Sequence, residues 1–345
     1  MFNRFMDFLS PDNPKTSGRS LDNILEPMDQ KIHNFETYVH PAPESKPRTS
    51  FTPNLPPGQA SMEKFTVRQF TKVMPQMVPL LYHMKRGSRW YNGKHKPARS
   101  HATPEIIAEL EALAHEAGVK DIRYIRVPRY TIFKDKGIPY DYAIVYTVEM
   151  DKEPIETAPS FDAMHEVMRG YKNLAIIGNR LSRFLRKQGF AAYPGTALGG
   201  VTDYVHLAEL AGLGAIGYHG LLITPGEGAR LRISTIYTNI ENLPVQNENE
   251  HVWVRDFCAM CHKCVRKCPV SAIYEQPKPR GDGGMQCIDH ATCRDYFAAN
   301  YGCAVCLAVC PFSQVGYDKV KERFKGNPNA PQFHIPVEAI PIAGQ

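Results

Sequence analysis

Hydrophobic residues recur at helical spacing in two long stretches of the chain, and each stretch predicts an amphipathic helix. The stretch 104–117 begins after Thr103, a favourable N-cap, with Pro104 at the first helical position, and Gly118 follows its end. The stretch 161–187 repeats the same spacing at greater length. Each of these helices therefore has one face to bury against a core.

Two shorter stretches also have a helical pattern. In the first, residues 65–74, we expect the helix to end before Pro75, because proline lacks an amide donor and its ring clashes with the preceding turn. The second is 204–210, just before a run of glycines.

Four stretches are rich in β-branched and aromatic residues and lie between turn-forming residues, which predicts strands. They are 121–127, 142–149, 221–224 and 230–238. Helices followed by strands along the chain imply a sheet layer covered by helices. The sequence therefore predicts an α/β or α+β fold.

The N-terminal stretch, up to about residue 59, is polar and holds nine of the 28 prolines. It predicts an irregular arm, and its composition does not decide between a disordered arm and one that wraps the body of the protein. The expected organisation is an arm over 1–60, a sheet domain over 61–245, a cysteine-rich domain over 246–320 and a tail over 321–345.

Length and composition allow one large domain or two medium ones. The chain has 345 residues, 43% of them hydrophobic, which is enough for a buried core. Its net charge of +6 is mild and does not call for a nucleic-acid partner. The N-terminus lacks the marks of a signal peptide, and no apolar run reaches the roughly 18 residues that a membrane span needs. We therefore expect a cytoplasmic protein.

All nine cysteines lie between Cys258 and Cys310. Two runs share the ending x3-Cys-Pro: Cys258-x2-Cys261-x2-Cys264-x3-Cys268-Pro269 and Cys303-x2-Cys306-x3-Cys310-Pro311. In such a run the first three thiolates converge on one 4Fe-4S cluster, and the cysteine before the proline binds a second one. A helix over 270–273 is expected to follow the first run.

This spacing predicts two clusters. The ligands of cluster one are Cys258, Cys261, Cys264 and Cys310, and those of cluster two are Cys268, Cys303, Cys306 and either Cys287 or Cys293. A zinc site fits less well, because it has no reason to prefer the x3-Cys-Pro ending. A disulfide framework would scatter its cysteines through a secreted chain.

The stretch 212–217 reads Gly-Leu-Gly-Ala-Ile-Gly and matches GxGxxG. A dinucleotide site needs a strand before this motif and a helix after it, whereas here a helix precedes it and a strand follows. The order excludes a Rossmann-type site. The glycines still predict a tight turn whose backbone can come close to a flat cofactor.

The order of these motifs resembles the reductive dehalogenases and their relatives, the epoxyqueuosine reductases of tRNA modification. The resemblance runs from about Ile125 to Ser313. It is carried by 207–217, 222–225, 228–232, 237–239, 257–269, 283–284, 293–297 and 302–312.

The resemblance implies a nitroreductase-like sheet domain with helices on both faces that binds cobalamin base-off. It also implies a ferredoxin-like domain with two 4Fe-4S clusters, and it favours Cys293 over Cys287 as the last ligand. The residues expected to bind the corrinoid are Gly212, Gly214, Gly217, Tyr218 and His206. The implied partners are a small substrate with a carbon–halogen or similar bond and a reduced ferredoxin or flavodoxin as electron donor.

The proton donor of the implied reaction has two candidates, Tyr171 and His219. Tyr171 lies on the apolar stripe of the helix 161–187, so it also fits a packed core residue, and as an acid it would need a cation beside it. Epoxyqueuosine reductases have an aspartate where this chain has Gly170. His219 follows the glycine turn, where dehalogenases often have arginine or lysine.

Two other functions are compatible with the sequence. The first is a redox carrier or activation protein that passes electrons to a partner, which the basic loop 85–96 would suit. The second is tRNA epoxyqueuosine reduction, against which Gly170 argues.

Overall fold

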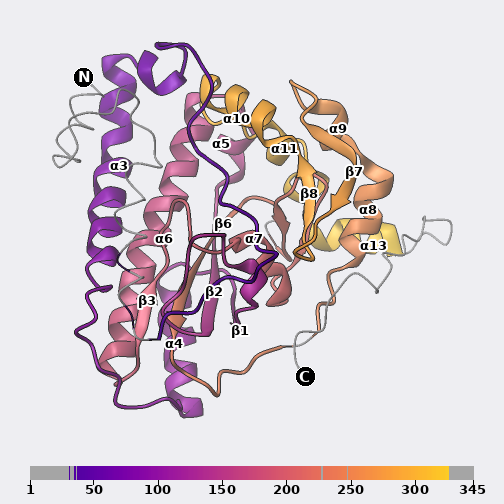
Figure 1. Ribbon diagram of the computed structural model, residues 1–345. Helices are drawn as coiled ribbons and strands as arrows, with labels where there is room; N and C mark the ends of the chain where they lie inside the picture. Colours follow the sequence, from indigo (N-terminus) through magenta and orange to yellow (C-terminus); the bar gives the residue numbers. More distant parts are fainter. Residues whose placement is uncertain (1–30, 32–34, 36, 227, 247, 326–345) are drawn as a thin grey trace.

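The structure is a computed structural model that describes residues 31, 35, 37–226, 228–246 and 248–325 (Figure 1). Residues 1–30 of the predicted arm and 326–345 of the predicted tail lie outside the described residues. None of the described helices combines the length and the apolar character that crossing a membrane requires.

A four-stranded antiparallel sheet forms the centre of the molecule, in the order β1-β2-β6-β3. Its strands are β1 (Ile122–Arg126), β2 (Tyr142–Glu149), β3 (Ala192–Pro194) and β6 (Leu231–Thr238). Strands β1, β2 and β6 were predicted, whereas the three residues of β3 are too few to show an alternating pattern. The fold is therefore mixed α/β with an antiparallel sheet.

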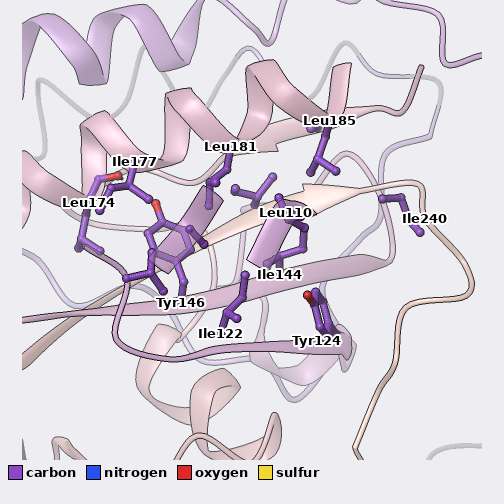
Figure 2. Packing of buried hydrophobic residues seen from close by; sticks show 14 of the residues in the cluster. Leu110, Ile122, Tyr124, Ile144, Tyr146, Leu174, Ile177, Leu181, Leu185 and Ile240 are labelled. Carbon is purple, nitrogen blue, oxygen red and sulfur yellow. The ribbon is translucent and has the colours of Figure 1, made fainter. Parts of the chain in front are cut away.

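The side chains of β2 alternate between two hydrophobic cores, as the period of a strand requires. Ile144, Tyr146 and Val148 point to one face of the sheet, and Ala143 and Val145 point to the other. Figure 2 shows the first face, where Ile144 and Tyr146 lie close to side chains of the overlying helix. Both faces are therefore buried.

Two predicted helices cover the first face: α4 (Pro104–Glu116) and α6 (Phe161–Lys187). The side chain of Thr103 accepts the amide hydrogen of Ile106 and so caps α4. Ser160 caps α6 in the same way. The bounds of both helices follow from sequence because their caps and periodicity are local. Helix α7 (Tyr204–Leu210), also predicted, contributes to the second core and contacts β6, β1 and β2.

Helix α3 (Val67–Ser88) corrects the expectation that a helix ends before Pro75. It continues through both Pro75 and Pro79 and packs along α6. The buried residues of α3 include Val73, Met77, Leu80 and Met84. Burial of this long apolar stripe outweighs the backbone hydrogen bonds that the two prolines cannot donate.

The sequence left open whether the arm is disordered or wraps the body of the protein. The described part of the arm wraps it. Val39 forms a β-bridge with Ile138. Further along, the Lys46 Nζ lies 2.5 Å from the Asp203 Oδ2. The amide of Asn54 then donates a hydrogen bond to a carboxylate in the cysteine-rich segment.

The cysteine-rich segment folds into short elements at the side of the sheet (Figure 1). They are α8 (Trp253–Cys261), α9 (Lys263–Lys267), β7 (Ile273–Pro279), β8 (Met285–Ile288), α10 (His290–Ala299), α11 (Val305–Ala308), α12 (Pro311–Gln314) and α13 (Tyr317–Lys325). The helix expected over 270–273 is wrong, because Ser271 has a φ of +52° and Ile273 opens strand β7. Helix α13 runs across residue 321, where the tail was expected to begin.

The remaining described elements are short. They are the 3₁₀ helices η2 (Ser61–Lys64) and η3 (Arg129–Thr131), helix α5 (Lys152–Glu156), and the hairpin of β4 (Ala215–Ile216) and β5 (Leu222–Ile223). Strand β4 lies within the glycine run 212–217, and β5 falls within the predicted strand at 221–224.

Replacing Leu110 tests the packing of α4 on the sheet. Its side chain is 0% exposed, so Leu110→Ala should lower the free energy of unfolding by about 2–5 kcal/mol through lost burial and a cavity. Denaturant unfolding followed by circular dichroism measures this. The control Val78→Ala changes a residue of α3 that is 48% exposed, and it should change stability by less than about 0.5 kcal/mol. Equal effects of the two variants would contradict this assignment of the core.

Candidate functional site

Four cysteines surround an open hollow. They are Cys258, Cys261, Cys264 and Cys310, and the same hollow is lined by Phe257, His262, Lys263, Pro311, Phe312 and His219. Burial raises the pKa of the Cys258 thiol well above its ordinary value, and neighbouring thiols add to the shift. Burial likewise raises the pKa of Cys310 to about 12. Such thiols become thiolates when a positive centre replaces their protons, so their chemistry suits an iron–sulfur cluster.

The other four predicted ligands lie together beside this first set. They are Cys268, Cys293, Cys303 and Cys306. Burial, followed by the nearness of Cys303 and Cys268, raises the pKa of Cys293 to about 11. The thiol of Cys306 interacts with cysteines of both sets, including Cys264 and Cys293. The two sets therefore adjoin each other, as electron transfer between two clusters requires.

Cys287 lies among charged residues. It is 3% exposed, and burial raises its pKa to about 11, while Arg255 counters the shift and Glu209 adds to it. Cys264, of the first set, adds a smaller upward shift to the pKa of Cys287. Cys293 therefore lies near Cys268 and Cys303 of the second set, whereas Cys287 lies near Arg255 and Glu209, and the choice of Cys293 as the ligand stays a prediction.

Backbone amides donate hydrogen bonds to several of these sulfur atoms. The amide of Ala272 lies 3.3 Å from the Cys268 Sγ, and the amide of Tyr218 donates to Cys258. Such bonds are one means by which proteins set the potentials of iron–sulfur clusters. Within the described ranges, no group of three or more His, Cys, Asp or Glu side chains could hold a single metal ion.

The glycine run 212–217 connects α7 to the β4–β5 hairpin. Gly212 follows α7 with a φ of +78°, a conformation that favours glycine. The carbonyl oxygen of Ile223 occupies the space that a side chain at Gly214 would need, and a Cβ at Gly217 would lie 2.7 Å from the Ile223 Cδ1. Gly214 and Gly217 thus face the protein's own hairpin, so the structure gives no support for a corrinoid against this turn. That role stays a prediction.

Tyr218 and His219, which follow this run, contact the first set of cysteines. The Tyr218 ring packs edge-on against His262, with ring centres 5.3 Å apart. His219 is 4% exposed, and burial lowers its pKa to about 4. At neutral pH its imidazole is therefore uncharged, a form that donates a hydrogen bond but releases its proton reluctantly.

Tyr171 lies elsewhere, partly buried against the core beneath α6. The guanidinium carbon of Arg232 is 4.9 Å from the centre of its ring, so a cation does accompany this tyrosine. A Cβ at Gly170 would lie 3.0 Å from the Arg232 Cγ, which explains why an aspartate would fit poorly there. Tyr171 does not line the hollow that contains His219.

His206, expected to bind the corrinoid, lies one turn into α7 and is buried. Burial lowers its pKa, and no described residue hydrogen-bonds its Nδ1. Its amide is capped by the carboxylate of Asp203. Asp203 in turn pairs with Lys46 of the arm and, at 3.2 Å, with Arg280 of the cysteine-rich segment.

The sequence did not predict the ion pairs that join the arm, α7 and the cysteine-rich segment. Besides Lys46 and Arg280, they include Arg255, whose Nη2 lies 2.6 Å from the Glu209 Oε1. The same carboxylate oxygen accepts the amide hydrogen of Ile216 at 2.7 Å. No sequence signal identifies such pairs, because the partners are far apart in the chain and ordinary in composition.

Curated proteins similar to this chain come from two related groups. A tetrachloroethene reductive dehalogenase of Desulfitobacterium hafniense is 34% identical over 200 residues, which cover 54% of this chain and 35% of that protein. The corresponding enzyme of Sulfurospirillum multivorans is 31% identical over 230 residues, 61% of this chain and 45% of that protein. An epoxyqueuosine reductase of Francisella cf. novicida (strain Fx1) is 33% identical over 118 residues, 31% of each chain.

The chain is a reductive dehalogenase-like protein, related to the epoxyqueuosine reductases. It spans less than half the length of the two dehalogenases above, 35% of one and 45% of the other. No protein-family model matches it.

Solved structures agree with the fold. A catabolic reductive dehalogenase in complex with 3-bromo-4-hydroxybenzoic acid matches with a TM-score of 0.59 and 21% identity, over 68% of this chain and 36% of that chain. A reductive dehalogenase whose structure suggests a mechanism for B12-dependent dehalogenation matches with a TM-score of 0.58 and 21% identity, over 68% of this chain and 37% of that chain. The mixed α/β fold of this reductive dehalogenase-like chain is thereby confirmed.

Replacing Asp203 tests the ion pairs between the arm, α7 and the cysteine-rich segment. Burial acts to raise the pKa of Asp203, but Lys46 and Arg280 outweigh it and hold the pKa at about 2. Because the pKa of Asp203 is lower in the folded than in the unfolded state, its ionised carboxylate stabilises the fold. This contribution is complete above about pH 4 and is lost as the pH falls toward 2. Asp203→Asn should therefore lower the free energy of unfolding by about 2 kcal/mol at pH 7.

The measurement is denaturant unfolding of both proteins between pH 7 and pH 3. The difference between them should stay constant down to about pH 5 and shrink below about pH 4. Asp141→Asn is the matched control, since it removes an exposed pair with Arg126 at 3.8 Å and should cost less than about 1 kcal/mol. A difference that grows as the pH falls would contradict the assignment.

Proposed function

We propose that this chain holds two 4Fe-4S clusters and is the redox core of a reductase of the reductive dehalogenase type. The observation that supports this most directly is the grouping of eight cysteines into two adjoining sets of four. Cluster one would be held by Cys258, Cys261, Cys264 and Cys310, and cluster two by Cys268, Cys293, Cys303 and Cys306. The similarity to two tetrachloroethene reductive dehalogenases supports the type of reaction.

The protein's part in electron transfer is to hold and tune these groups. A bound 4Fe-4S cluster supplies one-electron transfer at low potential. Buried residues such as His219 and Phe312 line the hollow, and amides such as those of Tyr218 and Ala272 donate hydrogen bonds to ligand sulfur atoms. Burial and such hydrogen bonds are the means by which a protein adjusts a cluster potential. A reduced ferredoxin or flavodoxin is the electron donor that suits two such clusters.

The final acceptor is proposed to be a small halogenated molecule, with cobalamin as the additional cofactor. Support comes from relatives, one of them solved with 3-bromo-4-hydroxybenzoic acid and one linked to B12-dependent dehalogenation. The described residues do not fit a corrinoid at the glycine turn, where the backbone of Ile223 stands against Gly214.

Tyr171 is the proposed proton donor to the substrate. The support is that a cation accompanies this tyrosine, since the guanidinium carbon of Arg232 lies over its ring, 4.9 Å from the ring centre. His219 suits this role less well, because burial lowers its pKa to about 4 and keeps it neutral.

A second candidate function is an electron carrier that reduces a partner protein. The packing of Ile223 against Gly214 and Gly217 favours this function, because a carrier needs the two clusters and no corrinoid at the glycine turn. Epoxyqueuosine reduction is supported by the identity to a Francisella enzyme over 118 residues. It is weakened by Gly170, where Arg232 leaves little room for an aspartate.

Replacing Cys293 and Cys287 by serine, one at a time, tests which of them is a ligand of cluster two. After anaerobic reconstitution, the wild-type chain should bind roughly eight iron atoms, and Cys293→Ser should bind roughly four because cluster two loses a ligand. Cys287→Ser is the matched control and should keep both clusters. Iron and sulfide analysis, with electron paramagnetic resonance of the reduced protein, measures this. The reverse result would assign Cys287 to cluster two.

Cobalamin binding and halide release test the proposed reaction. The full chain with both clusters should quench its fluorescence on adding cobalamin, and with a strong reductant it should release bromide from 3-bromo-4-hydroxybenzoic acid. Tyr171→Phe should slow halide release about 100-fold or more, as expected for loss of a general acid, with the clusters intact. If a chain with both clusters neither binds cobalamin nor releases halide, the carrier function takes the place of this one.

A further inference from the structure

The imidazole of His219 is held in one position by the loop of the β4–β5 hairpin. In this loop the amide of Gly217 donates to the carbonyl of Leu221 at 3.0 Å, and the amide of Gly220 donates to the carbonyl of Gly217 at 2.8 Å. Gly220 has a φ of +76°, a conformation that L residues rarely adopt. A Cβ at Gly217 would lie 3.2 Å from the His219 Cε1. The tight loop therefore fixes where the ring lies.

The hydrogen bonds of this loop also decide which ring nitrogen carries the proton. The amide of Leu221 donates to the His219 Nδ1 at 3.1 Å. A nitrogen that accepts a hydrogen bond cannot carry a proton, so the neutral ring is protonated at Nε2. Nε2 is buried, and none of the described residues accepts a hydrogen bond from it. A buried donor without an acceptor is costly, so this N–H is expected to meet an acceptor in the complete protein.

The hollow beside His219 contains the acceptor that the proposed function supplies. The ring lines the same hollow as Cys258, Cys261, Cys264 and Cys310. These four thiols already complete the ligands of one cluster, so the ring is not needed on iron. Sulfur atoms of the cluster or of its ligands can accept a hydrogen bond from an N–H group.

We propose that the Nε2–H of His219 donates a hydrogen bond to sulfur of cluster one and thereby raises the reduction potential of that cluster. This inference rests on the proposed function, because it requires the cluster. Reduction adds an electron whose negative charge spreads over the sulfur atoms, and a donor aimed at sulfur stabilises the reduced state more than the oxidised one. Cluster two, held by the other four cysteines, does not share this contact.

The experiment is a redox titration of the reconstituted full chain, followed by electron paramagnetic resonance. In His219→Leu the ratio of reduced to oxidised cluster one at a fixed potential should fall about tenfold, equivalent to a potential lower by about 59 mV. Cluster two should keep its potential and serves as an internal reference. His219→Gln should restore most of the shift, because its amide nitrogen can reach the position of Nε2 and donate.

His83→Leu is the matched control. His83 lines a different hollow, between α3 and α6, and its Nδ1 is also buried without a partner among the described residues. Its replacement should leave both potentials unchanged. An equal shift from His83→Leu would indicate a general effect of lost packing and would overturn the proposal.

Iron and sulfide analysis separates failure of the inference from failure of the proposed function. A wild-type chain that assembles no clusters contradicts the function itself. Two intact clusters with an unchanged potential in His219→Leu overturn the inference alone, and so does loss of cluster one in both His219→Leu and His219→Gln. Electron–nuclear double resonance of reduced cluster one provides a further readout, because the wild type should show one coupled exchangeable proton, beyond those of the backbone amides, that His219→Leu lacks and His219→Gln retains. Absence of that proton would also overturn the proposal.

Discussion

Burial of many cysteine thiols in one small segment is the constraint on which the rest of the structure depends. Thiolates are unfavourable in a buried site unless positive charge compensates them, and here burial raises the pKa of Cys258, Cys293 and Cys310. Short helices with left-handed residues between them, such as His262 and Ala304, bring the thiols of distant runs together. An iron–sulfur cluster would supply the positive centre that lets such buried thiols ionise.

The sheet domain supports this segment through contacts between backbone and side chain. The Arg230 side chain donates to the carbonyl oxygens of Met150, at 2.6 Å, and Ser313, at 3.3 Å, and so joins the sheet edge to α12. At Gly228, with a φ of +63°, a side chain would collide with the backbone of Phe312. Glycine is therefore required where the two parts touch, and the same contact fixes the hollow lined by Cys258 and Cys310 relative to the sheet.

Charged residues at the junction hold three parts of the chain together. Asp203 caps α7 and pairs with both the arm and the cysteine-rich segment. Glu209, near the end of the same short helix, pairs with Arg255 and holds the hairpin that carries His219. Removing one partner of a buried ion pair leaves the other charge uncompensated, which penalises other arrangements, and here the pairs connect the wrapping arm to the site.

The sequence by itself determined what depends on near neighbours. The bounds of α4 and α6 follow from caps and periodicity, and the division of most cysteines into two sets follows from their spacing. Pro75 and residues 270–273 were predicted wrongly, because packing of α3 on α6 and the left-handed turn at Ser271 outweigh local preference. Only the tertiary structure placed Cys293 with Cys303 and Cys268, paired Lys46 with a carboxylate 157 positions away, and put His219 beside the cysteines. Such contacts depend on distances in space, which local sequence patterns do not encode.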